Sequence, residues 1–390
     1  MSTVYLYSHT HWDREWYQPF EVFRLHLLAV VKQVLADLEA GRLSQFYLDG
    51  QAVVLEDVLE LEPELGPRLV AQMQQGELSA GPWYVLPDQM LVSGESLIRN
   101  LQFGIAAVKK LGDAALVGYC PDTFGHSHDL PRILQGFKID SAFVWRGVSE
   151  LVREPFFWWE SPDGSRVLAW HFSRGYYQTL LHERIHNEDL ASHAVQVRQQ
   201  LFELMAPTDP ADGTAGLYCA LLDGGLFPCG ADHTAPPPDL RALLESVNQS
   251  GDLKIQPIQL TAFAAKIREI VTAKPTVVAL INRELRDNRS SKRYGNAYLL
   301  PGVLSTRLYL KRQNREDELR LARFNEPLFA MLHALKLAQY PASAFSYAWK
   351  LLLKNHPHDS ICGCSVDAVH DEMVERSARF NQVLATLEDQ

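Results

Sequence analysis

The sequence lacks the marks of a membrane, secreted or nucleic-acid-binding protein. No apolar run approaches the roughly 18 residues of a membrane-spanning helix, and no basic segment followed by an apolar one forms a secretory signal at the start. Its five cysteines are irregularly spaced, which makes a disulfide framework unexpected and favours a cytoplasmic location. With 37 basic against 47 acidic residues, the net charge of −10 argues against nucleic acid or membrane as a partner.

Apolar residues are abundant enough for a large core. They make up 47% of the 390 residues, which leaves room for two or three domains. Strand-length apolar segments alternate with helical ones through about residue 250, a pattern that predicts a parallel sheet or barrel with helices outside. The expected strands are 4–7, 45–48, 115–119, 142–145, 167–170 and 217–222.

Helical periodicity is clear in both halves of the chain. The early helices are expected at 22–39, 54–74 and 97–110, and the first two end at Gly41 and Gly76, the residue type that best accepts a left-handed cap. After Lys274 the composition changes: the segment 283–296 is polar and charged, and it is expected to be an exposed loop. Three further helical stretches, 316–337, 342–353 and 366–387, have the apolar spacing of a small bundle.

Ionisable residues follow most of the expected strands. In α/β folds, functional groups gather on the loops that leave the carboxyl ends of parallel strands. Core packing gives no reason for such a distribution, so these positions are candidates for chemistry. They are the segment 8–17 after the first strand and then Asp49, Asp122, Arg146 and Asp223 after later ones.

The cluster after the first strand combines histidine, carboxylate and aromatic residues. In extended chain, His11 and Asp13 point to the same side, as a cation's ligands must, but His9 shares that parity and spacing alone does not choose between the histidines. A polar turn with one satisfied histidine is the alternative. The nearby Trp12 and Trp16 offer flat apolar faces that suit sugar rings.

Two other segments contain paired histidines. His182 and His186 match the pattern of zinc peptidases, but residues 187–189 resemble a helix start, which would leave both histidines outside the helix that this chemistry requires. The match is therefore interpreted as accidental. Near the other end, Pro357 interrupts the helices and leaves His358 and Asp359 at their junction, where Asp359 could serve as a cap or in a site.

Taken together, long motifs of the sequence resemble glycoside hydrolase family 38, the retaining alpha-mannosidases, and especially its bacterial branch. They span residues 8–364 in family order, so the resemblance covers nearly the whole chain and is specific. The matching stretches are HTHWDREWY, YLDGQ, GPWYVLPDQMLVSGESLIRNL, GYCPDTFGH, FVWRG, GADHTAPPPDL, LPGVLSTRLYLK and NHPHDSICGC.

The resemblance implies an α/β fold with a seven-stranded (β/α) barrel followed by a three-helix bundle. On this chain we expect the barrel at 1–275, a connecting segment at 276–312 and the bundle at 313–390. It also implies one divalent metal, most often Zn²⁺. The expected ligands, which choose His11 over His9, are His11, Asp13, Asp122 and His358.

The implied reaction needs two carboxyl groups. Asp122 matches the nucleophile, which attacks the anomeric carbon while the metal grips the 2- and 3-hydroxyls of mannose. Asp232 is the best match for the acid/base, with Asp223 as a rival because residues 224–230 look like an insertion after the strand. The positions that match substrate-contacting or carboxylate-orienting residues are Trp16, Phe124, Arg146 and Asp359, with Arg307 as a further candidate.

The partner implied by the resemblance is a mannose-containing oligosaccharide or glycoside. Family members continue into β-sandwich domains, which we expect to be missing from this chain, and the exposed bundle could form a homo-oligomer. A metal-dependent polysaccharide deacetylase is one rival function, but His126 and His128 do not have the spacing it requires. The others are a zinc peptidase that uses His182 and His186 and a carbohydrate- or metal-binding protein that has lost catalysis.

Overall fold

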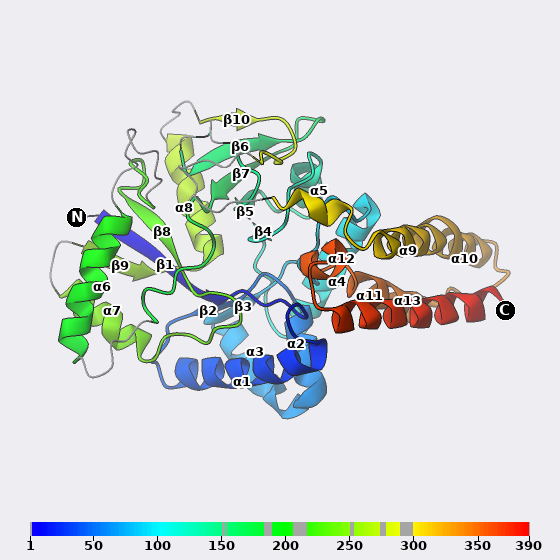
Figure 1. The fold of residues 1–390 in the computed structure, drawn as a ribbon, viewed down its shortest axis with the longest axis horizontal. Helices are drawn as coiled ribbons and strands as arrows, with labels where there is room; N and C mark the ends of the chain where they lie inside the picture. The colour runs from blue at the N-terminus through cyan, green and yellow to red at the C-terminus, as the bar shows by residue number, and fades with distance from the viewer. Residues whose placement is uncertain are drawn as a thin grey trace.

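Two five-stranded sheets with helices packed around them form the larger part of the molecule, and a group of long helices projects from it (Figure 1). This computed structural model describes residues 2–149, 152, 154–182, 189–205, 217–249, 253–273, 278–288 and 299–389. Within these residues, no helix combines the length and the apolar character that crossing a membrane requires.

The first sheet is built around the N-terminal strand and is parallel throughout. Its order is β3-β2-β1-β8, and β9 also pairs with β1. Because all these strands run the same way, their carboxyl ends meet at one edge, where the site lies. The strands are β1 (Ser2–Thr10), β2 (Phe46–Leu48), β3 (Leu78–Ala80), β8 (Gly224–Cys229) and β9 (Leu253–Pro257).

The second sheet has the order β10-β6-β7-β5-β4, and only β6 and β7 are antiparallel neighbours. Over the described residues the two sheets do not join into a closed barrel. The expected α/β fold with a parallel sheet is therefore confirmed, while the closed seven-stranded barrel is not seen. The strands are β4 (Gly118–Cys120), β5 (Ser141–Val144), β6 (Phe156–Glu160), β7 (Arg166–His171) and β10 (Leu280–Ile281).

The strand expected at 217–222 is wrong. This segment forms a turn in which Cys219 donates its backbone N–H to Gly224, and Asp223 adopts a left-handed φ of 46°. The true strand is β8, the stretch that looked like an insertion. A β-carbon on Gly224 would lie 2.0 Å from the Thr3 carbonyl oxygen, so glycine permits the close approach of β8 to β1. Glycine and proline in β8 weaken the sequence signal of a strand, which explains the error.

The helices around the sheets largely follow the sequence. Gly41 and Gly76 adopt φ values of 68° and 75°, as the expected helix ends require. The helix expected at 54–74 is broken near Pro63, which has no N–H for a helical hydrogen bond. The helices are α1 (Phe20–Glu39), α2 (Val53–Leu61), η1 (Pro63–Leu65), α3 (Gly66–Gln74), α4 (Gly94–Val108), α5 (Leu130–Gly136), α6 (Leu190–Leu204), α7 (Leu240–Asn248) and α8 (Leu260–Ala273).

The last quarter of the chain is largely helical, and its long helices lie side by side (Figure 1). The first of them begins eight residues before the expected 316 and passes through a short π-helical turn, whereas the expected 342–353 and 366–387 agree closely with the structure. The elements are η2 (Pro301–Leu304), α9 (Leu308–Leu319), η3 (Arg320–Asn325), α10 (Glu326–Ala334), α11 (Ala342–Leu353), α12 (His358–Cys362) and α13 (Asp367–Glu388).

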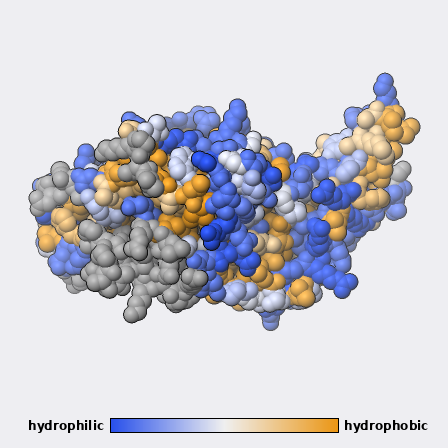
Figure 2. Space-filling model, turned by 90° about the horizontal axis from the view of Figure 1, so that it is seen from above, coloured by the Kyte–Doolittle hydropathy of each residue, from blue (hydrophilic) through white to orange (hydrophobic). Residues whose placement is uncertain are grey.

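The projecting end of this helical region exposes apolar side chains. Orange, apolar side chains are visible on the arm at the right of Figure 2. In and after α10, the most exposed are Leu335 at 61% and Leu337 at 70%. The polar segment expected at 283–296 is exposed over much of 282–288, although Leu285 is buried, and 289–298 lie outside the described residues.

Candidate active site

The site begins where β1 and β8 continue side by side beyond their regular ends. His11 forms a parallel bridge with Asp232, and its backbone N–H donates to the Ala231 carbonyl oxygen at 3.1 Å. His233 in turn donates its backbone N–H to the His11 carbonyl oxygen at 2.8 Å. This extended pairing places the first loop and the loop after β8 at the same sheet edge.

Three of the expected metal ligands converge there. His11, Asp13 and His358 each offer a ligand atom, and these atoms all lie within 4.8 Å of one another. The two Nε2 atoms lie 3.2 Å (His11) and 3.4 Å (His358) from Asp13 Oδ1. Both Nε2 atoms are buried, and neither makes a hydrogen bond. Ligands of a tetrahedral zinc ion at its usual bond lengths lie about 3.4 Å apart, so these residues fit such an ion.

Asp122, the fourth expected ligand, lies just after β4 and shares His358 with this group. Its Oδ2 is 3.6 Å from His358 Nε2, while Oδ1 accepts a hydrogen bond of 2.6 Å from Arg146 Nε. Burial opposes ionisation, but the charges of Arg146 and His358 outweigh it and hold the pKa of Asp122 below its usual value. The carboxylate is therefore ionised at neutral pH, as a nucleophile or a ligand must be.

Negative charge accumulates around His358. Burial disfavours its imidazolium form, yet the carboxylates of Asp359, Asp13 and Asp122 raise the pKa of His358 to about 9. Asp359 is itself buried, with Oδ2 3.8 Å from His358 Nε2, and accepts a hydrogen bond from the Cys364 thiol at 3.0 Å. A site with this many carboxylates favours a positive charge, which a divalent cation could supply in place of the proton.

Asp232 lies beside this cluster and is held by a tyrosine. Tyr176 donates its hydroxyl to Asp232 Oδ1 at 2.8 Å, and the Tyr176 ring lies 4.7 Å from the ring of His11. Burial, followed by the charges of Asp13 and Asp122, raises the pKa of Asp232. Tyr176 was not expected from the sequence, although it lies in the loop after β7, the one expected strand that no candidate residue follows.

Asp223, the rival acid/base, lies at the opposite end of β8. Its carbonyl oxygen accepts the backbone N–H of Thr3 at 3.0 Å, at the start of β1, and its side chain accepts a hydrogen bond from Tyr218. The six residues of β8, about 20 Å of extended chain, separate Asp223 from the loop that carries Asp232.

Asp49 is bound directly to His11. Its Oδ1 lies 3.0 Å from His11 Nδ1, the ring nitrogen that faces away from the metal group. From the sequence, Asp49 was expected at a strand end, but no role could be assigned to it. Its hydrogen bond to His11 joins residues that follow two different strands, and no local pattern shows such a contact.

Aromatic rings border the cluster. The Phe124 ring meets the His358 ring edge-on at 5.6 Å, and the guanidinium of Arg146 lies 5.2 Å from the centre of the Phe124 ring. Trp16 is half-buried and packs against the exposed Tyr17, with ring centres 5.0 Å apart.

Other expected residues lie elsewhere. Arg307 forms an ion pair of 2.7 Å with Asp367 and donates to the Gly363 carbonyl oxygen. His9 stacks on Tyr7 at 4.8 Å and is not in the ligand group. His182 approaches the Ala235 carbonyl oxygen at 3.1 Å.

The rival functions gain no support from this geometry. His186, which the zinc-peptidase reading needs, lies outside the described residues. For the deacetylase, His126 lies against Trp159 and His128 is within hydrogen-bonding distance of Asn282, so neither joins the ligand group.

Comparison with known families accounts for this arrangement. Residues 1–277 match the model of the glycosyl hydrolases family 38 N-terminal domain. The chain belongs to glycosyl hydrolase family 38. Residues 299–390 of this family 38 chain also match the alpha mannosidase middle domain, so both the sheet region and the helical region have counterparts in known mannosidases.

Individual relatives and a solved structure are similar to this chain over nearly all of its length. The chain is 32% identical to a predicted mannosylglycerate hydrolase of Halalkalibacterium halodurans, over 98% of this chain and 41% of the relative. It is 27% identical to human alpha-mannosidase 2C1, over 95% of this chain and 33% of that protein. An alpha-mannosidase structure from Enterococcus faecalis superposes with a TM-score of 0.87 at 31% identity, covering 100% of this chain and 42% of that one. The family 38 chain thus spans about two fifths or less of the length of these relatives.

Proposed function

We propose that this family 38 chain is the catalytic part of a retaining alpha-mannosidase that hydrolyses terminal alpha-linked mannose. The observation that carries the proposal is the convergence of the Asp13 carboxylate with two histidine nitrogens that make no hydrogen bond, next to Asp122 and Asp232 at one sheet edge. Neither a storage protein nor a purely structural domain has a reason to bring three carboxylates together with two buried histidines.

The ligand set suits a divalent cation, and its mixture of imidazole and carboxylate favours zinc. His11, Asp13, Asp122 and His358 would hold the ion. When bound, it supplies positive charge that can bind the 2- and 3-hydroxyls of mannose and orient the ring. Phe124 and Trp16 would border the sugar, Arg146 would keep the Asp122 carboxylate oriented, and Asp359 would bind sugar hydroxyls.

The reaction then follows from the two carboxyl groups. Asp122 forms a bond to the anomeric carbon as the bond to the leaving oxygen breaks, and Asp232 donates its proton to that oxygen. In the second step Asp232 takes a proton from water, the water oxygen bonds to the anomeric carbon, and the Asp122 carboxylate is released. Two inversions leave the alpha configuration unchanged.

The finer architecture belongs to the same proposal. Family membership leads us to expect a seven-stranded (β/α) barrel at 1–275, a connecting segment at 276–312, a three-helix bundle at 313–390 and further β-sandwich domains. The likeness to the Enterococcus faecalis structure, which is more than twice as long, supports this. The cytoplasmic location and a homo-oligomer stay predictions from the sequence.

Hydrolysis of p-nitrophenyl alpha-mannoside tests the function, with the beta-mannoside and the alpha-glucoside as controls. Turnover of the alpha-mannoside alone is expected, and proton NMR should show alpha-mannose as the first product. Beta-mannose as the first product would contradict the retaining mechanism. Mannosylglycerate deserves a parallel assay because one relative is named for it. No turnover of any alpha-mannoside, with zinc bound and the protein folded, would overturn the proposal for this chain.

A further inference from the structure

The turn that follows β2 is strained in a way that fixes one carboxylate. Asp49 adopts a left-handed φ of 50°, which is uncommon for residues other than glycine, and Gly50 follows at 68°. A β-carbon on Gly50 would lie 2.7 Å from the Tyr119 ring, so the turn accepts only glycine there. The fold therefore tolerates an unfavourable backbone to place the Asp49 side chain.

Every direction around that carboxylate is occupied. Asp49 is 0% exposed, and its Oδ2 accepts hydrogen bonds from the Trp12 backbone N–H at 2.7 Å and from Gln51 Nε2 at 3.0 Å. Gln51 Nε2 also donates to the Trp12 carbonyl oxygen, which fixes the direction of its amide. The third partner is His11 Nδ1, which lies 3.0 Å from Oδ1 and 2.9 Å from Oδ2.

The proton on His11 Nδ1 follows from this arrangement. An ionised carboxylate can only accept, so His11 must carry its proton on Nδ1. The lone pair of the neutral imidazole is then on Nε2, the atom that faces Asp13. A histidine held by a carboxylate in this way has a fixed ring orientation and is a better metal ligand.

We propose that Asp49 is a positioning residue for the metal centre: it selects the His11 tautomer whose Nε2 can bind a cation. Asp49 itself does not touch substrate or metal. The inference rests on the proposed function only in taking His11 as a metal ligand, so it can be tested by metal binding without any glycosidase assay.

Asp49→Asn is the sharpest variant, because the asparagine side chain has the same shape. If the NH₂ group of the asparagine faces the Trp12 backbone N–H, two hydrogen-bond donors oppose each other. If the NH₂ group faces His11, the Nδ1 atom of His11 must accept a hydrogen bond. The imidazole proton then moves to Nε2, which removes the lone pair from the metal side. Either result should lower zinc affinity by about 10- to 100-fold. Competition with a chromophoric chelator measures this directly.

Asp57→Asn is the matched control. Asp57 is also a buried carboxylate, but it pairs with Arg14 at 2.8 Å, and no hydrogen bond or ion pair joins it to His11 within the described residues. It should lose stability while keeping zinc affinity within about twofold of the wild type. Long-range ¹H–¹⁵N spectra of the metal-free proteins, recorded where the His11 ring has lost its positive charge, should show the Nδ1–H form of His11 in the wild type and Asp57→Asn only.

The outcomes separate the two proposals. A wild type that does not bind zinc would contradict the proposed metal centre, whatever Asp49 does. Wild-type zinc affinity in Asp49→Asn, or an equal loss in Asp57→Asn, would overturn the role of Asp49. If Asp49→Asn does not fold, Gln51→Ala removes one of the bonds that hold the carboxylate and should give a smaller loss in the same direction, whereas unchanged affinity there would also overturn it.

Discussion

Glu15 and Arg376 form a buried ion pair that joins the loop after β1 to helix α13. Glu15 is 0% exposed and also accepts a hydrogen bond of 2.8 Å from Ser360. Glu15 lies two residues after Asp13, and Ser360 lies two residues after His358. This contact therefore fixes the separation of Asp13 and His358, two proposed metal ligands that come from different parts of the fold.

Glu15→Ala should destabilise the protein strongly, because it leaves the Arg376 guanidinium in a buried position without its partner. Breaking a buried pair from one side typically costs about 3–5 kcal/mol. Urea denaturation of the metal-free protein measures the loss. The control is Glu95→Ala, which removes a partly exposed pair with Arg99. Such a pair contributes about 0.5 kcal/mol or less, and equal losses in the two variants would refute the structural role of Glu15.

Zinc should raise the melting temperature of the wild type. An ion that binds only the folded state stabilises it by about 2.7 kcal/mol at 100 times its dissociation constant. His358→Ala removes a ligand and should lose most of this increase. His356→Ala removes a buried histidine within hydrogen-bonding distance of Asn314 and should keep it. The increase on zinc addition is compared within each variant, so differences in starting stability do not matter; a full increase in His358→Ala would exclude that residue as a ligand.

Asp122→Ala should abolish turnover, since it removes the carboxylate that is proposed to bond to the anomeric carbon. A fluorinated mannoside that reacts quickly in the first step and slowly in the second should label the wild type on the peptide that contains Asp122, as mass spectrometry would show. His182→Ala should remain active and become labelled like the wild type. Label on another aspartate would reassign the nucleophile.

Asp232→Asn should slow the hydrolysis of mannosides with poor leaving groups by about 10²–10⁴-fold, the usual contribution of a general acid. The loss should be much smaller for a dinitrophenyl mannoside, whose leaving oxygen needs no proton. Asp223→Asn should behave like the wild type with both substrates, because Asp223 lies at the far end of β8. The ratio of kcat/KM values for the two substrates is the measurement, and a changed ratio in Asp223→Asn would reverse the assignment.

The residues of the proposed metal site could be singled out from the sequence because they follow strands or helix ends in long motifs. His11 and Asp13 are two residues apart, so in an extended chain their side chains point to the same side. This depends only on neighbouring residues and can be read from the sequence. The choice between His9 and His11 needed the family resemblance. In the structure the His9 ring stacks on the ring of Tyr7, which lies on the same strand. The spacing of His9 and Asp13 along the chain gave no sign that His9 makes this contact and is not in the ligand group.

The remaining features depend on contacts between distant residues. β8 was missed because its glycines, one of which permits the close approach to β1, and its proline weaken the local signal of a strand. The role of Asp49 depends on β2 pairing with β1 at His9 and Thr10, and that of Glu15 on a helix 361 positions later. No local pattern encodes such pairs.

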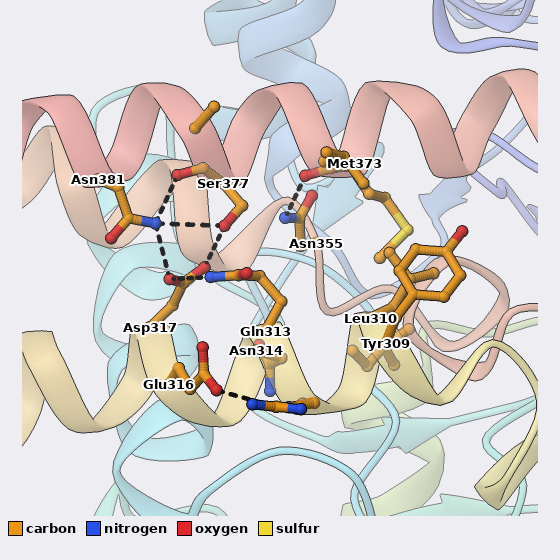
Figure 3. Close-up of a pocket in the computed structure, with 14 residues that line it drawn as sticks. Tyr309, Leu310, Gln313, Asn314, Glu316, Asp317, Asn355, Met373, Ser377 and Asn381 are labelled. Atoms are coloured by element: carbon orange, nitrogen blue, oxygen red, sulfur yellow. Dashed lines mark hydrogen bonds and ion pairs between the residues drawn. The ribbon is translucent and has the colours of Figure 1, made fainter.

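A groove of ≈ 480 Å³ between α9 and α13 has a carboxylate, Asp317, on its wall (Figure 3). Asp317 accepts hydrogen bonds from Ser377 at 2.5 Å, Asn381 at 2.9 Å and Gln313 at 3.0 Å. Burial nevertheless raises the pKa of Asp317, and these hydrogen bonds only partly oppose that shift.

The stability contributed by Asp317 should therefore fall as the pH rises. In the unfolded chain an aspartate loses its proton near pH 3.9, whereas the folded protein holds it to a higher pH, so each step upward through this window favours unfolding. Asp317→Asn cannot lose a proton, and its free energy of unfolding should rise relative to that of the wild type between pH 4 and 7. Urea titrations across this range measure the difference. The exposed Asp113→Asn controls for the loss of one negative charge, and an equal pH trend in that variant would contradict a specific effect of burying Asp317.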